Sequence, residues 1–168
     1  MSSPIVTPVS VVESSGYRFV IFDAPNDANL HVYLKEMQKH KVGHVVRVCD
    51  STYETKSLEE QGIQVHDWPF VDGEPPPDAI INSWLSLVKE TFVDDKKSKG
   101  DKSQTKAIGI HCVAGLGRAP VMVAIALIEK GMDPLDAVQT IRTRRRGAIN
   151  AKQLAFLQSY KRGARGTD

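Results

Sequence analysis

The stretch from residue 107 to residue 131 constrains the fold of this chain more than any other. Residues 107–110 form an apolar run typical of a buried strand, and residues 120–128 form a longer apolar run that predicts a helix ending at Gly131. The sequence HCVAGLGR lies between the two runs. A strand, a glycine-bearing loop and a helix start together predict an anion-binding cradle, because the loop N–H groups and the positive end of the helix dipole converge on one point.

The residues at the two ends of this loop indicate its chemistry. Cys112 begins the loop and Arg118 ends it. An arginine can bond two phosphate oxygens at once, and its charge, together with the helix dipole, favours the thiolate form of a cysteine. We therefore expect Cys112 to be a nucleophile aimed at a bound oxyanion, rather than a structural cysteine before an ordinary turn. The expected phosphate-binding residues are Val113, Ala114, Gly115, Leu116, Gly117 and Arg118.

Length and composition are those of a soluble globular chain. A length of 168 residues, with 25% charged and 41% apolar residues, fits a single domain over residues 1–168. The net charge of +2 is too small to indicate a nucleic-acid partner. Basic residues gather in the C-terminal third, which leaves open an anionic substrate, peripheral contact with an anionic membrane, or simply a solvated helix face. These residues are Arg142, Arg144, Arg145, Arg146, Lys152, Lys161, Arg162 and Arg165.

Several kinds of segment and site are not expected. No run of 18 or more apolar residues could span a bilayer, and MSSPIVTPVS lacks the basic start and apolar core of a signal peptide. Two cysteines without a secretory signal indicate reduced thiols, so we expect a cytoplasmic protein. We expect no metal site, because the sequence lacks tightly spaced histidine, cysteine or carboxylate ligands, and no cofactor. The oligomeric state is left open.

Strands and helices alternate along the chain. The apolar patterns predict strands at 9–12, 17–22, 45–48, 63–65 and 107–110. They predict helices after a cap at Asn26 and ending at Gly43, within 51–62, at 78–92, at 120–131, from Asp133 through Arg146, and after Asn150. Residues 1–8 are expected to be a lead-in and residues 94–106 a charged loop. This order predicts an α/β fold with a mostly parallel central sheet flanked by helices.

Ligands in such folds bind beyond the carboxyl ends of the strands. Three features are expected at that edge: Cys49 after one strand, a loop carrying Asp72, and the loop that begins at Cys112. A thiolate that attacks a phosphate monoester leaves an oxygen that needs a proton, and Asp72 is the best candidate donor. Asp67 is a competing candidate that precedes Trp68 and could face away from the site.

The loop sequence resembles the phosphate-binding signature of cysteine-dependent protein tyrosine phosphatases, and VAGLGRAP resembles more narrowly the version in the phosphatases of regenerating liver. WPFVDGEPPP is similar to the acid loop of that family, whose general acid falls on Asp72. Val71 stands where the family has a first aspartate. Further matches include residues 46–49, 136–139 and 152–154, so the resemblance covers nearly the whole chain.

This resemblance implies the phosphatase fold with a shallow site, and hydrolysis of phosphotyrosine in a phosphorylated protein substrate through a phosphocysteine on Cys112, with dual specificity left open. It also implies binding to cyclin-M magnesium-transport mediators. A binding module whose pocket engages an acidic loop of such a mediator is therefore the alternative function. The family ends in a prenylated C-a-a-X box, whereas this chain ends RGARGTD, so we do not expect prenylation of this sequence.

The residue after Arg118 predicts the rate. Most tyrosine phosphatases have serine or threonine there, and its hydroxyl can bond the sulfur as the phosphocysteine breaks down. Ala119 cannot make that bond, so slow hydrolysis of the intermediate is expected.

Cys49 is the expected redox partner of Cys112, and the same resemblance implies this pairing. If the two strands that end near these residues are neighbours, about 4.8 Å apart, a disulfide is within reach after small adjustment. The alternative is that Cys49 is simply a small apolar residue at the end of a strand. His111 could orient the loop through hydrogen bonds or be an ordinary partly buried histidine.

Overall fold

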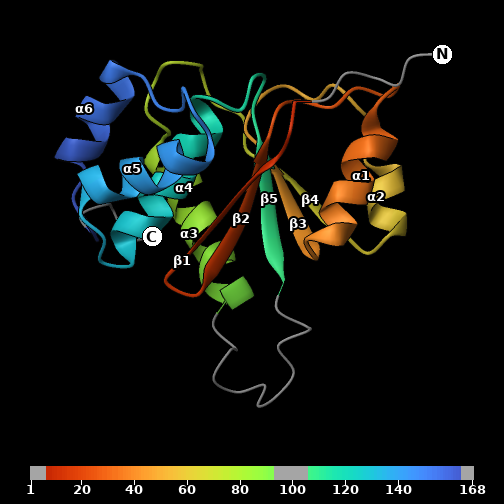
Figure 1. Ribbon diagram of the computed structural model, residues 1–168, viewed down its shortest axis with the longest axis horizontal. Coiled ribbons are helices and arrows are strands. Elements are labelled where there is room, and N and C mark those ends of the chain that lie inside the picture. Colours follow the sequence, from red (N-terminus) through yellow and green to blue (C-terminus); the bar gives the residue numbers. More distant parts are fainter. Residues whose placement is uncertain (1–6, 93–105, 164–168) are drawn as a thin grey trace.

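The computed structural model of the protein describes residues 7–92 and 106–163 (Figure 1). Most of the predicted lead-in at 1–8 and of the predicted charged loop at 94–106 lies outside the described residues, so these two predictions are not tested.

A five-stranded sheet forms the centre of the molecule, in the order β1-β2-β5-β3-β4. Its strands are Ser10–Ser14 (β1), Tyr17–Phe22 (β2), Val42–Arg47 (β3), Gln64–Asp67 (β4) and Ala107–His111 (β5). Only the hairpin partner β1 runs antiparallel, and β2, β5, β3 and β4 pair in parallel. The predicted mostly parallel sheet is confirmed, and the carboxyl ends of four strands meet at one edge.

Helices cover both faces of this sheet (Figure 1). They are Leu30–Lys39 (α1), Lys56–Glu60 (α2), Asp78–Phe92 (α3), Arg118–Glu129 (α4), Pro134–Arg144 (α5) and Ala151–Ser159 (α6). Two separate hydrophobic clusters fill the space between sheet and helices, one beneath α1 and α2 and the other beneath α3 to α6. Within the described ranges, no helix combines the length and the apolar composition that crossing a bilayer requires.

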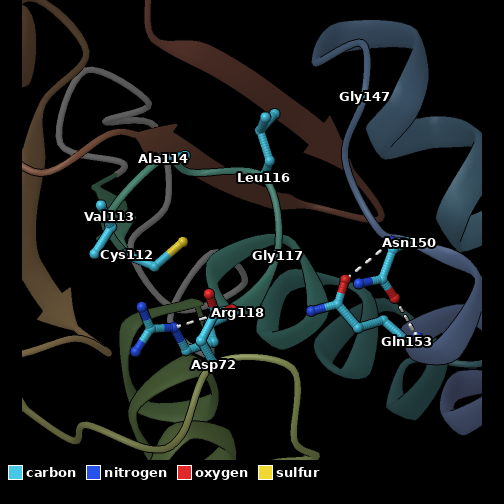
Figure 2. Close-up of a pocket in the computed structure, with 10 residues that line it drawn as sticks. All are labelled: Asp72, Cys112, Val113, Ala114, Leu116, Gly117, Arg118, Gly147, Asn150 and Gln153. Carbon is cyan, nitrogen blue, oxygen red and sulfur yellow. Dashed lines mark hydrogen bonds and ion pairs between the residues drawn. The ribbon is translucent and has the colours of Figure 1, made fainter.

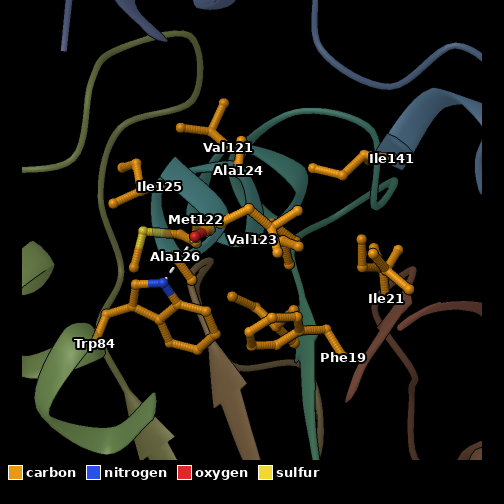
Figure 3. Packing of buried hydrophobic residues seen from close by; sticks show 14 of the residues in the cluster. Phe19, Ile21, Trp84, Val121, Met122, Val123, Ala124, Ile125, Ala126 and Ile141 are labelled. Carbon is orange, nitrogen blue, oxygen red and sulfur yellow. Dashed lines mark hydrogen bonds between the residues drawn. The ribbon is translucent and has the colours of Figure 1, made fainter. Parts of the chain in front are cut away.

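The helix α4 is buried on every side along residues 119–128, which explains its continuous apolar sequence. Trp84 of α3 packs against it and donates a hydrogen bond from Nε1 to the carbonyl of Met122 at 2.7 Å (Figure 3). Phe19 of β2 also packs against the indole, with ring centroids 5.6 Å apart. This packing holds α4, and therefore the loop before it, against the sheet.

The first helix differs from its prediction at both ends. It begins at Leu30 rather than after Asn26, because Asn26 and Asn29 accept hydrogen bonds from each other's backbone N–H groups at 2.9 and 2.8 Å and close a loop instead. It ends at Lys39, and the chain reverses at Lys41, which has a φ of 62°. Gly43, the predicted terminator, lies inside β3.

The later helix caps follow the prediction. The side chain of Asp133 accepts a hydrogen bond from the N–H of Leu135 at 3.0 Å. Asn150 and Gln153 form a capping box, in which each side chain accepts from the other's backbone N–H. However, α5 ends at Arg144 rather than Arg146, so Arg145 leaves the helix with an extended backbone. That difference matters for the site.

Candidate active site

A pocket of about 310 Å³ opens at the carboxyl edge of the sheet (Figure 2). It lies over the loop 112–118, which we call the phosphate loop, and beside the loop 68–77, which we call the acid loop. The structure therefore brings together the predicted nucleophile, arginine and acid from two loops far apart in sequence. The lining residues are Asp72, Cys112, Val113, Ala114, Leu116, Gly117, Arg118, Gly147, Asn150 and Gln153.

Four successive carbonyl groups of the phosphate loop, those of residues 113–116, accept hydrogen bonds from groups outside the loop. The carbonyl of Val113 accepts from the N–H of Ala24 at 2.9 Å, and that of Leu116 accepts from the N–H of Ile149 at 2.7 Å. The carbonyls of Ala114 and Gly115, between them, accept from Arg145. In a trans peptide the N–H points away from the C=O. The N–H groups of residues 114–117 are thus turned toward the pocket, where they can bind an anion.

Arg145 is the buried clamp behind this loop. Its Nε donates to the carbonyl of Gly115 at 2.7 Å, and its Nη2 donates to that of Ala114 at 3.3 Å. Its Nη1 donates to Pro8, Ser10 and Ile21, so that the guanidinium ties the loop to the first hairpin. Burial lowers the pKa of Arg145 from its usual value. Among the basic cluster of the C-terminal third, this residue is not part of a solvated helix face.

Gly115 is required by both conformation and space. Its φ of 71° lies in the left-handed region that favours glycine. A Cβ there would lie 2.6 Å from Nη2 of Arg145 and 2.7 Å from the carbonyl oxygen of Phe22. The close approach of the clamp to the loop therefore depends on the missing side chain.

Cys112 lies at the floor of the pocket and is only 3% exposed. Its Sγ accepts a hydrogen bond from the backbone N–H of Ala119, in the first turn of α4, at 3.5 Å. The sulfur thus faces the positive end of the helix dipole of α4.

Arg118 joins the phosphate loop to the acid loop. Its Nη1 donates to the carbonyl of Phe70 at 2.9 Å, and its Nε lies 3.7 Å from Oδ1 of Asp72 (Figure 2). This Nε is buried and makes no hydrogen bond within the described part of the chain. Asp72 itself is exposed, with 76% of its side chain accessible, so its carboxyl group stands at the mouth of the pocket.

The competing acid, Asp67, is occupied elsewhere. Its two carboxylate oxygens accept hydrogen bonds from Nε and Nη2 of Arg47 at 2.5 and 2.8 Å. These bonds lower the pKa of Asp67. Of the two candidate acids, Asp72 lines the pocket and Asp67 does not.

His111 lies fully buried beneath the phosphate loop, in a hydrogen-bonded position. Its Nε2 is 2.8 Å from the hydroxyl of Tyr53, and its Nδ1 is 3.3 Å from the carbonyl of Cys112. A carbonyl can only accept, so Nδ1 carries the proton and Nε2 accepts from Tyr53. Burial lowers the pKa of His111 to about 4, which keeps the ring neutral at pH 7.

Cys49 follows β3, and Cys112 follows β5, which is the strand next to β3 in the sheet. Both thiols are free and buried. Cys49 does not line the pocket, and its Sγ lies 3.8 Å from Nδ1 of His111. Burial raises the pKa of the Cys49 thiol, and the neighbouring Cys112 raises it further. The two strand ends are neighbours, as expected.

The sequence did not predict a role in the site for three residues that line or support it: Arg145, Asn150 and Gln153. The cap at Asn150 was predicted, but not that the first turn of α6 would form a wall of the pocket. No local pattern in the sequence distinguishes Arg145 from the neighbouring arginines. Within residues 7–92 and 106–163, no group of three or more histidine, cysteine or carboxylate side chains could hold a metal ion.

Comparisons with known proteins agree with this geometry. The sequence profile described as protein-tyrosine phosphatase matches residues 23–160. A probable protein tyrosine phosphatase type IVA A from Dictyostelium discoideum is 57% identical over 159 residues, which cover 95% of this chain and 91% of the relative. Protein tyrosine phosphatase type IVA 3 from Homo sapiens is 49% identical over 144 residues, covering 86% of this chain and 79% of the relative.

A solved structure described as a putative protein tyrosine phosphatase from Leishmania major has the same fold. It superposes with a TM-score of 0.81 at 41% identity and covers 93% of this chain and 100% of the other.

Proposed function

This chain belongs to the protein-tyrosine phosphatase family and, within it, to the type IVA group, the phosphatases of regenerating liver. From that premise we propose that Cys112, Arg118 and Asp72 hydrolyse phosphotyrosine in protein substrates. The observation that carries this assignment is that the four loop carbonyls from Val113 to Leu116 point away from the pocket and are hydrogen-bonded there. The N–H groups of the same peptides therefore point into the pocket, where they can bind phosphoryl oxygens.

In the first step, the thiolate of Cys112 attacks phosphorus and the bond between phosphorus and the tyrosine oxygen breaks. The loop N–H groups hold the phosphoryl oxygens, and the unused Nε of Arg118 adds a charged donor. Asp72, at the pocket mouth, gives its proton to the leaving oxygen. The products are a phosphocysteine and the dephosphorylated substrate.

In the second step, water attacks the phosphocysteine, Asp72 accepts a proton from that water, and the thiolate of Cys112 leaves. Sulfur must then take up negative charge. The N–H of Ala119 lies 3.5 Å away, and Ala119 has no hydroxyl to add a second donor. We therefore propose that this second step is slow and limits turnover.

Trapping the intermediate tests this function. Purified protein is mixed with a peptide that carries radiolabelled phosphotyrosine and is denatured within milliseconds to seconds. We expect label on the peptide fragment that contains Cys112, and a burst of dephosphorylated product close to one equivalent. Cys112→Ser is the control and should carry no phosphothioester. Product formation without label, or with label elsewhere, would contradict the assignment.

A second function is supported by the apolar rim of the pocket. Of the four large apolar side chains exposed in the described residues, Val71, Val113 and Leu116 belong to the two loops of the site. Such a rim is typical of a surface that contacts a protein partner. A partner of the cyclin-M type could place a carboxylate in the phosphate pocket and apolar residues on this rim. Binding of such a partner that excludes phosphate and leaves Cys112 unmodified would support this second role.

A peroxide-sensitive switch at the same site is part of the proposal. Peroxide oxidises the Cys112 thiolate to a sulfenic acid and is itself reduced to water. The thiol of Cys49 then displaces water from this sulfur, so that a disulfide forms, and a thiol reductant reverses it. The neighbouring strand ends and the buried, unpaired Cys49 support this pairing.

A further inference from the structure

A second, smaller cavity lies directly beside the phosphate pocket. It has a volume of about 140 Å³ and lies between the acid loop, α4 and α6. It is lined by residues 73–75 of the acid loop, by Val121 of α4, and by Lys152, Gln153 and Phe156 of α6. A protein cavity of about 150 Å³ can hold a benzene ring. The space therefore suits one apolar side chain of the size of leucine.

The charged residues around this cavity do not make it an ion-binding site. Nζ of Lys152 lies 3.5 Å from Oε2 of Glu74, so the two charges already pair with each other. Both side chains are largely exposed, at 70% and 57%. The other side chains of the lining are the uncharged ones of Pro75, Val121, Gln153 and Phe156. An apolar group that enters this space leaves water without burying an unpaired charge.

One side chain separates the two cavities. Gln153 lines both of them and is only 5% exposed. Its Oε1 accepts from the N–H of Asn150 at 2.9 Å, and its Nε2 lies 2.9 Å from the position of a Cβ on Gly117, so the amide is held against the phosphate loop (Figure 2). On the other side, the acid loop passes from Asp72 at the first cavity to Gly73 at the second. The two cavities therefore lie side by side, with the side chain of Gln153 between them.

We propose that the second cavity, which we call the apolar subsite, binds an apolar side chain of the phosphorylated protein substrate, close in sequence to the phosphotyrosine. This inference rests on the proposed phosphatase function. An extended peptide rises about 3.3 Å per residue, so a residue one or two positions from the phosphotyrosine can reach a cavity that shares a wall with the phosphate pocket. The exposed rim residues Val71 and Leu116 favour such a peptide over a small phosphorylated metabolite.

The subsite has a consequence for catalysis because the acid loop forms one of its walls. A side chain that fills it packs against residues 73–75, which directly follow Asp72. Binding energy at the subsite then restrains the loop that carries the acid. Substrates with an apolar residue at the matching position should gain in kcat/KM by about tenfold, the lower end of the discrimination that an apolar pocket provides.

A peptide series tests the subsite. The peptides carry phosphotyrosine in an alanine background, with a single leucine or a single serine at each of the two positions on either side. We expect the ratio of kcat/KM, leucine over serine, to reach about ten at one position and to stay near one at the others. Phe156→Ala removes a wall and should bring that ratio below two. Leu154→Ala, on the same helix but outside the cavity lining, is the matched control and should keep the ratio.

The possible failures can be told apart. Because each ratio is taken within one variant, a loss of folded protein cancels. Ratios near one at all four positions of the wild type, or a ratio that survives Phe156→Ala, would overturn the subsite while leaving the phosphatase assignment intact. Absence of Cys112-dependent release of phosphate from free phosphotyrosine and from every peptide would overturn the phosphatase assignment, and the subsite with it.

Discussion

Replacing Gly115 by alanine would test how the phosphate loop is held. The added Cβ meets Nη2 of Arg145 at 2.6 Å and the carbonyl oxygen of Phe22 at 2.7 Å, and the φ of 71° is itself unfavourable for alanine. Gly16 offers a matched control in the turn of the first hairpin. Its φ is 86°, and a Cβ there has no atom within 4 Å. Gly16→Ala therefore measures the backbone cost alone.

The expected magnitudes follow from these contacts. The left-handed conformation costs alanine about 1–2 kcal/mol, which is the whole expected effect of Gly16→Ala. In Gly115→Ala the clash also displaces Arg145 from at least one loop carbonyl, and a hydrogen bond from a charged donor contributes about 1.5–3 kcal/mol. The total is about 2.5–5 kcal/mol. At about 2–4 °C per kcal/mol for a chain of this size, Tm should fall by about 2–8 °C for Gly16→Ala and about 5–20 °C for Gly115→Ala.

Two assays, thermal unfolding and hydrolysis of phosphotyrosine at a temperature where both variants are folded, check this. Gly16→Ala should keep the wild-type kcat/KM. Gly115→Ala should lose about 100-fold, because the loop N–H groups shift relative to the phosphoryl oxygens. Equal losses of Tm in the two variants, or full activity in Gly115→Ala, would show that the contacts of Arg145 and Phe22 do not determine the loop geometry.

Four further outcomes are expected. Ala119→Ser should raise steady-state turnover, and equal single-turnover and steady-state rates in the wild type would contradict a slow second step. Asp72→Asn should lower kcat about 100-fold or more for phosphotyrosine and much less for an ester with an acidic leaving group, measured by phosphate release. Peroxide should give a Cys49–Cys112 disulfide by mass spectrometry; Cys112 sulfinic acid without a crosslink, in wild type as in Cys49→Ser, would exclude the protective role. His111 takes up a proton near pH 6.5 in the unfolded protein but only near pH 4 in the folded protein. The free energy of unfolding should therefore fall as the pH drops through this range, by about 3 kcal/mol from this residue. Denaturant titrations at several pH values should show a weaker dependence of the unfolding free energy on pH in His111→Gln than in the wild type.

Predictions that depended on neighbours in the chain were the most successful. The cysteine, the glycines and the arginine of the phosphate loop, and the helix after it, lie within one stretch of residues. The caps at Asp133 and Asn150 bond within three residues of their own positions. The predicted start of the first helix was wrong because two nearby residues, Asn26 and Asn29, are both suitable caps. They bond each other's backbone N–H groups, and the helix therefore begins at Leu30.

The sequence by itself thus determined the fold class, the phosphate loop and the pair of candidate acids. Only the tertiary structure showed that Arg47 binds the carboxylate of Asp67 and that Asp72 lines the pocket beside Cys112, because these contacts join residues far apart in the chain. It alone decided that Arg145 clamps the loop, through carbonyls 30 and 31 residues earlier in the chain. Such contacts leave no local pattern in the sequence. Whether an arginine is buried or exposed depends on which groups the fold places beside it, and here the sheet and α5 bring Arg145 to the carbonyls of the phosphate loop.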